Sequence, residues 1–209
     1  MKTLVCVALT MCAITSVSTA QPTPAIVQGP DQWTVDVTFE HPQQIMLQRT
    51  NKPELFWYTI ISVTNNTAED VHFFPKCELM TNTFQILPAG RNVPPAVFQL
   101  IKRRHKQKYP LLEHLERTSS RILQGEEHAK DLALIWPDFD AQATAIQIFI
   151  AGLSNETAVI EHPTKKDQAG QPVKVYLRKT LELAYKLKGD PSLRPYLKVT
   201  YKDKDWVMR

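Results

Sequence analysis

The stretch VKVYLRKTLELAYKL, residues 173–187, decides the fold class because its side chains alternate in character. Apolar residues fall on the odd-numbered positions, with Lys179 as the single exception, and the even-numbered positions are mostly charged or polar. Alternation with a period of two is typical of a β-strand with one buried face. At about 3.3 Å per residue the stretch would be roughly 50 Å long if straight. Because few strands are that long, we expect a bulge or bend near residues 178–180.

Similar patterns recur along most of the chain. Residues 55–63, LFWYTIISV, are largely apolar on both faces and predict a central strand that is covered on both sides. Further strands are predicted at residues 33–39, 71–74, 77–80, 83–87, 132–136, 146–150 and 197–201. Short strands separated by turn residues, without long alternating helices, favour a mainly β fold over a parallel α/β fold. We expect an Ig-like antiparallel β-sandwich that forms a single domain over residues 31–209.

The pattern changes between residues 94 and 123, where we expect a helical insertion. The proline pair at residues 94–95 can open a helix, because proline fits the first helical turn. Apolar residues at helical spacing follow at 97–101, and Pro110 then interrupts the pattern. Over residues 111–123 apolar side chains again recur at intervals of three and four, which predicts a second helix.

The first twenty residues, MKTLVCVALTMCAITSVSTA, have the form of a secretory signal peptide. The positive charge of Lys2 precedes an apolar run that is too short to span a bilayer, and small residues allow cleavage after Ala20. Residues 21–30 are rich in proline and uncharged, so we expect an extended leader. The predicted location is therefore secreted or periplasmic, and we expect no transmembrane segment in the mature chain.

The net charge limits which partners the protein can attract, and the cysteine content limits what can stabilise its fold. Cleavage would remove Lys2, so 24 Lys and Arg residues would face 21 Asp and Glu residues, a net charge of +3. Such a small excess means that an anionic partner would have to be recognised by local charge. Only Cys77 would remain of the three cysteines, so no intramolecular disulfide can form and the core must hold the domain together. Glycine-rich nucleotide-binding motifs are missing, and we expect no cofactor.

Several longer segments carry a resemblance to a known group. They are FWYTIISVTNNTAED at 56–70, GEEHAKDLALIWPDFD at 125–140, FIAGLSNETAV at 149–159, VYLRKTLELAYKLKGDP at 175–191 and WVMR at 206–209. Together they resemble a group of uncharacterised secreted bacterial proteins with an Ig-like β-sandwich domain. The resemblance implies the fold and the compartment and implies no activity. The chain departs from antibody-type domains because it lacks their Cys…Trp…Cys pattern.

The stretch PPAVFQLIKRRHKQKYP, residues 94–110, contains the strongest local charge. Its basic side chains form a possible patch for anionic contacts: Lys102, Arg103, Arg104, His105, Lys106 and Lys108. On a helix they would form a cationic flank suited to lipid head groups or an anionic polymer. They could equally form a solvated face that is neutralised by nearby acidic residues: Glu113, Glu116, Glu126 and Glu127. We do not expect nucleic acid, because only Tyr109 offers a nearby aromatic ring for stacking.

Metal-binding patterns are weak. No H-x-H or HExxH motif is present, so the sequence gives no zinc motif. His72, Cys77 and Met80 match the ligand types of a β-sandwich copper site, but such a site needs a second histidine, normally between the Cys and Met ligands. Asp138 and Asp140 match part of a calcium loop, without its glycine and terminal glutamate. We therefore predict no metal site.

These observations favour a non-catalytic binding or envelope-assembly module that contacts another envelope protein. One alternative is a binder of anionic polymer or membrane surface through residues 102–108. Another is a hydrolase with a carboxylate or cysteine site assembled from distant parts of the chain, although the G-x-S-x-G motif is missing. Such an enzyme would bring Asp138, Asp140, Glu126 or Cys77 together with a histidine in one cleft.

Overall fold

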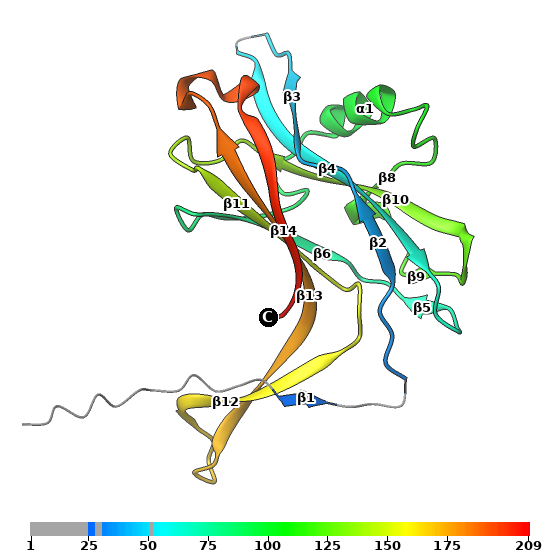
Figure 1. Cartoon of the computed structure of the whole chain (residues 1–209), viewed down its shortest axis with the longest axis vertical. Helices are drawn as coiled ribbons and strands as arrows, with labels where there is room; N and C mark the ends of the chain where they lie inside the picture. Colours follow the sequence, from blue (N-terminus) through cyan, green and yellow to red (C-terminus); the bar gives the residue numbers. More distant parts are fainter. Residues whose placement is uncertain (1–24, 28–30, 51) are drawn as a thin grey trace, which may run out of the picture.

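The structure is a computed structural model that describes residues 25–27, 31–50 and 52–209 (Figure 1). Within these residues strands dominate and most strand pairs are antiparallel, which confirms the mainly β prediction. The predicted signal peptide, residues 1–20, lies outside the described residues. Of the predicted leader, residues 25–27 are described, and they form a strand of the larger sheet.

The larger sheet has the strand order β1-β12-β13-β11-β6-β7, and β14 pairs with β13 off this path. Its strands are β1 (Ala25–Val27), β6 (Lys76–Thr81), β7 (Ile86–Pro88), β11 (Ala145–Ala151), β12 (Thr157–Lys166), β13 (Pro172–Lys188) and β14 (Lys198–Met208). Every pair in this sheet is antiparallel. The long strand β13 therefore has three partners along its length: β12, β11 and β14.

The second sheet has the order β2-β4-β10-β8, and β3 also pairs with β4. Its strands are β2 (Asp36–Phe39), β3 (Gln43–Leu47), β4 (Glu54–Asn65), β8 (Glu113–His114) and β10 (Gly125–Pro137). The β8–β10 pair is parallel and the others are antiparallel. The remaining elements are the pair β5 (Val71–His72) and β9 (Arg121–Ile122), helix α1 (Pro95–Arg104), and the 3-10 helices η1 (Leu115–Arg117) and η2 (Pro191–Tyr196).

The main core lies between the two sheets. It joins buried side chains of β4 and β10 with those of β11 and β13: Trp57, Ile61, Val63, Leu132, Leu134, Trp136, Ile146, Ile148, Ile150, Leu181, Leu183 and Tyr185. Burial of apolar surface contributes about 25 cal/mol per Å², so this cluster is the principal source of stability in the described residues, whose one cysteine, Cys77, is free.

A second core covers the outer face of the smaller sheet. Side chains of β4 and β10 that point away from the main core pack here against α1, through Val97 and Ile101, and against Leu112. Strand β4 thus buries both of its faces, and Phe56 to Ile61 are all nearly inaccessible to solvent. The prediction of a central strand at residues 55–63, covered on both sides, is confirmed.

The stretch that predicted the fold class forms β13, and its odd-numbered side chains face the main core over residues 181–187. Leu181, Leu183 and Tyr185 are buried, whereas Val175 and Leu177 are half-buried. The bulge that was one of the two alternatives near 178–180 is not found there. The pairing irregularities of β13 lie in the partner strand β14, opposite Ala184 and the residue after it, and in the partner strand β12, between Glu161 and Lys166. What changes near Arg178 is the partner of β13, from β12 to β11 and β14.

The helical insertion at 94–123 is only partly correct. Helix α1 ends at Arg104, and residues 111–123 form β8, η1 and β9 in place of the predicted second helix. Three apolar residues of this segment are buried, and they enter different cores: Leu112 packs in the outer core, whereas Leu115 and Ile122 pack in the main core. Leu111 and Leu123 are exposed. One straight helix cannot direct its apolar face into two cores, so the chain takes an irregular path between them. The strand predicted at 83–87 likewise begins only at Ile86.

Candidate interaction surfaces

The basic run begins on helix α1, which lies against the outer face of the smaller sheet (Figure 1). Pro95 occupies the first helical turn, where the missing N–H costs no hydrogen bond. The last turn contains Lys102, Arg103 and Arg104, and positive charge is favourable at this end of the helix dipole. The buried residues Val97 and Ile101 fix which face of α1 points to solvent.

Two of the six basic residues bind inward. The hydroxyl of Tyr58, a buried residue of β4, lies 2.9 Å from Nε2 of His105 and donates to Oε1 of Gln43 over 2.9 Å. Nη1 of Arg104 donates to the same hydroxyl and to the carbonyl of Gln44, each over 3.3 Å. Burial raises the pKa of Tyr58. Burial also lowers the pKa of His105, and the nearby positive charge of Arg104 lowers it further. Arg104 and His105 therefore attach the end of α1 to the sheet.

Lys108 makes a second attachment, at the segment after α1. Its ammonium group contacts Oε1 of Glu40, which also accepts a hydrogen bond of 2.7 Å from the hydroxyl of Tyr109. The hydrogen bond from Lys108, and then that from Tyr109, lowers the pKa of Glu40. Lys108 is thus neutralised within the molecule.

The remaining three basic residues form the outward cationic surface: Lys102, Arg103 and Lys106. Nζ of Lys102 lies 5.9 Å from the ring centroid of Phe98, and Arg103 and Lys106 are exposed. None of the three has an ion-pair partner among the described residues, and Glu113, expected as a neutralising neighbour, pairs with Lys130 instead. The structure therefore divides the predicted patch into an attached half and a free half.

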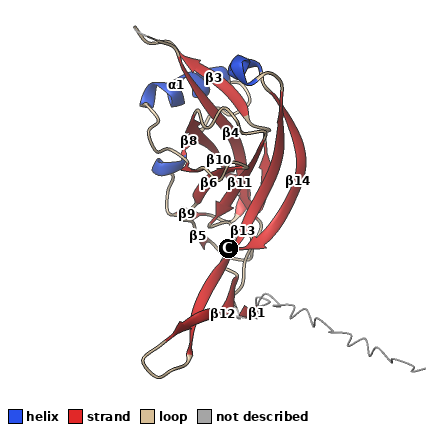
Figure 2. Ribbon diagram, turned by 90° about the vertical axis from the view of Figure 1, so that its left-hand side faces the viewer, coloured by secondary structure: helices blue, strands red, loops and turns tan. Residues whose placement is uncertain are grey.

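A second candidate surface, not anticipated from the sequence, is a three-stranded projection that we call the arm. It consists of β1, β12 and residues 172–178 of β13, and it extends below the two packed sheets (Figures 1 and 2). In it Ile26 and Tyr176 have exposed fractions of 58% and 67%, high values for large apolar or aromatic side chains. A signal was present in the sequence, since the alternating stretch is too long for an ordinary strand.

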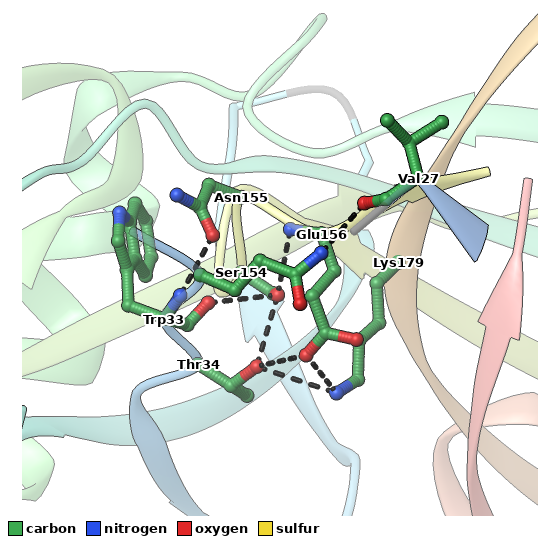
Figure 3. A network of polar contacts seen from close by, with 8 residues as sticks. Val27, Trp33, Thr34, Ser154, Asn155, Glu156 and Lys179 are labelled. Atoms are coloured by element: carbon green, nitrogen blue, oxygen red, sulfur yellow. Dashed lines mark hydrogen bonds and ion pairs between the residues drawn. The ribbon is translucent and has the colours of Figure 1, made fainter. Parts of the chain in front are cut away.

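A polar network joins the arm to the packed sheets (Figure 3). Nζ of Lys179 donates to Oε1 of Glu156 over 2.5 Å, and the Thr34 hydroxyl donates to the same oxygen over 3.0 Å. The hydrogen bond from Lys179 lowers the pKa of Glu156. Lys179 is the one residue that breaks the apolar alternation of β13, and its place in this network explains the exception.

Ser154 and Asn155 extend this network to the segment that leads into β2 (Figure 3). The Ser154 hydroxyl donates to the carbonyl of Trp33 over 2.9 Å, and the Thr34 hydroxyl, 2.9 Å away, shares its one proton between Ser154 and Glu156. Oδ1 of Asn155 accepts from the Trp33 N–H over 2.7 Å. The start of the arm is thereby fixed to both sheets.

Glu126 lies far from the other two candidate catalytic carboxylates, Asp138 and Asp140. Glu126 is near the beginning of β10 and Asp138 follows its end, and the paired stretch of β4, from Asn65 to Phe56, spans about 30 Å between them. Asp138 accepts hydrogen bonds from Trp57 over 2.8 Å and from the buried Arg194 over 2.7 Å. It lines a cavity of about 560 Å³ that no histidine lines. Asp140 caps the following turn by accepting from the Gln142 N–H over 2.9 Å.

The candidate thiol and metal ligands are not brought together either. Cys77 is buried in the main core, and this burial raises its pKa well above the ordinary value. Met80 is three residues further along β6, so its side chain points to the opposite face of the sheet from Cys77. His72 is exposed and stacks on Phe74. In the described part of the chain, no group of three or more His, Cys, Asp or Glu side chains lies close enough to hold a metal ion.

Comparisons with known proteins give no relative. No protein-family model, no curated protein and no solved structure matches the chain. Among the described helices, none is long and apolar enough to cross a membrane.

Proposed function

We propose that this protein is a secreted or periplasmic, non-catalytic module that binds another protein of the cell envelope. The proposed scaffold is an Ig-like β-sandwich, supported by two sheets that pack face to face around one core. The observation that carries the proposal is the arm. Apolar side chains on an extended single layer of strands are costly to leave in water, and such strands favour pairing with another chain.

Site-specific photo-cross-linking tests this function. A benzophenone amino acid would replace Tyr176 on the arm, Lys106 beyond α1, or Phe84 in a turn, a control that is more exposed than Tyr176. We expect Tyr176 to give a discrete protein adduct in the native envelope, while Phe84 gives none. Absence of protein adducts from both Tyr176 and Lys106 would refute the binding function.

A second candidate function is contact with an anionic polymer or membrane surface through Lys102, Arg103 and Lys106. It is favoured by the free charge of these residues, which no carboxylate neutralises in the described structure. Contacts of this kind weaken steeply as salt rises.

Substitution of Arg103 and Lys106 by Glu tests this candidate without disturbing Arg104 and His105, which attach α1. The matched control places Glu at Lys165 and Lys166, two exposed positions on the arm. If α1 is the contact, retention on heparin and on phosphatidylglycerol vesicles falls in the first variant and much less in the second. Equal losses in both would mean that general charge, and not the α1 surface, causes retention.

A further inference from the structure

We propose that the outer edge of β13 at residues 172–178 receives an extended segment of the partner, in which acidic side chains alternate with aliphatic ones. This inference rests on the proposed function and specifies the chemistry of the partner. The argument has three parts: the direction of the free backbone groups, the side chains that flank them, and the contrast with the neighbouring edge.

The direction of the backbone groups follows from bonds at the junction of arm and sheets. The N–H of Arg178 donates to the carbonyl of Arg209 on the β14 side over 2.8 Å, and the Arg209 N–H returns a bond of 3.1 Å. The N–H of Lys179 points the other way, to the carbonyl of Glu156 over 3.0 Å. Since backbone groups alternate along a strand, those of Lys174 and Tyr176 point to the same side as those of Arg178.

No described strand pairs with that side below Arg178. Strand β14 reaches only Lys179 in register, whereas β12 occupies the opposite side of β13 down to residue 172. Within the described residues, the outward N–H and C=O groups of Lys174 and Tyr176 have no backbone partner. A strand added here would continue the line of β14 and complete the ladder of the arm.

The side chains along this edge define the partner. Lys174, Tyr176 and Arg178 are exposed on one face, and neither Lys174 nor Arg178 has an ion pair in the described chain. Val175 and Leu177 are half-buried on the opposite face and belong to neither of the two cores of the described residues. Directly opposed cross-strand pairs stabilise a sheet, so carboxylates belong opposite the cations and aliphatic side chains beside the valine and leucine.

The neighbouring edge shows the contrast. Strand β14 also pairs with no described strand on its outer side, but it presents a run of exposed charges of both signs: Lys202, Asp203, Lys204 and Asp205. Alternating charge on an edge discourages pairing. On its exposed face the edge at 172–178 has only positive charge of its own, and the one carboxylate opposite it on β12, Glu161 beside Lys174, leaves an excess of positive charge that selects an acidic partner.

A second copy of this chain is a poorer occupant. With Tyr176 opposite its symmetry equivalent, Lys174 would face Arg178 of the other copy, which is a repulsive pair. With Val175 at the centre, Lys174 would face Tyr176, and no carboxylate would be supplied. An acidic segment of another protein satisfies both cations.

Peptide binding to the full chain tests the inference. The probes are blocked, fluorescein-labelled peptides in which Glu, or in a matched control Lys, alternates with Val. Replacement of Tyr176 by Pro removes the outward N–H and spares the ladder to β12, while Tyr176→Ala keeps that N–H. We expect the Glu peptide to bind the unaltered chain and Tyr176→Ala, and to bind Tyr176→Pro at least about tenfold more weakly. Thermal unfolding would check that both variants remain folded.

Charge reversal supplies a second test of the inference. A Lys174→Glu/Arg178→Glu variant should prefer the Lys peptide over the Glu peptide. Failure of the Glu peptide to bind, while Tyr176 still cross-links in the envelope, would overturn the inference and leave the binding function intact. Concentration-dependent dimers that Tyr176→Pro abolishes would identify a second copy as the occupant and would also overturn it.

Discussion

The two halves of β13 share one sequence pattern and have different surroundings. Above Arg178 the strand lies between β11 and β14 and faces the second sheet, so Leu181 and Leu183 are inaccessible to solvent. Below it β12 is the one partner among the described strands, and Val175 and Leu177 are half-buried. Alternation of apolar and polar residues therefore specifies a strand with an apolar face, but not what covers that face.

The largest expected difference comes from one substitution made in each half. Leu183→Ala removes a fully buried side chain from the main core and should lower the free energy of unfolding by about 3 kcal/mol. Leu177→Ala, on the same face of the same strand, should lower it by about 1 kcal/mol, because its surroundings are partly water already. Urea unfolding of both variants measures the contrast. Equal losses would show that the arm is packed as tightly as the core.

The predictable part of the fold is the part in which a local pattern has one solution. β4 and the upper half of β13 were predicted because their apolar residues match strand periodicity and both lie in the core. The second helix at 111–123 was wrong because spacing alone cannot show that Leu112 and Leu115 enter different cores. The arm was missed because the sequence does not show where the second sheet ends.

The candidate surfaces were predictable to a similar extent. The six basic residues at 102–108 were visible as a run, and the beginning of α1 followed from its prolines. Their division into attached and free residues depends on Tyr58 and Glu40, which are distant in the sequence. Only the folded arrangement reveals that Lys102, Arg103 and Lys106 are the outward members.

Alanine substitution of two glycines with positive φ tests how tightly the chain is packed at the junction and at the end of the arm. Gly152 (φ +87°) joins β11 to β12, and an added Cβ would lie 2.5 Å from the carbonyl oxygen of Phe74. Gly170 (φ +78°), in the turn before β13, would meet no atom within 4 Å. Both alanine variants incur left-handed strain of about 1 kcal/mol, and Gly152→Ala adds a backbone clash of about 1 kcal/mol or more. Thermal unfolding should show a clearly lower Tm for Gly152→Ala; equal Tm values would contradict the tight junction.

The smallest expected effect is pH-dependent and concerns the Glu156–Lys179 pair at the junction. Because Lys179 lowers the pKa of Glu156 in the folded chain, this pair stabilises the junction above the ordinary pKa range of glutamate. The stabilisation is lost as pH falls through the lowered value, where the folded-state carboxylate takes up its proton. Hydrogen exchange at the amides of Val35 and Lys179, corrected for intrinsic rates, should therefore show protection that declines in this acidic window.

Glu156→Gln should remove that acidic decline and lower the protection of the same amides severalfold at neutral pH, since a charge-assisted bond is replaced by a neutral one. Glu161→Gln, which removes an exposed carboxylate further along β12, is the matched control and should leave both unchanged. If the acidic decline persists in Glu156→Gln, another group controls the junction. If the acidic decline disappears, the Glu156–Lys179 pair controls the junction. Lys179, the one polar residue on the apolar face of β13, then marks the point where the strand leaves the packed sheets and the arm begins.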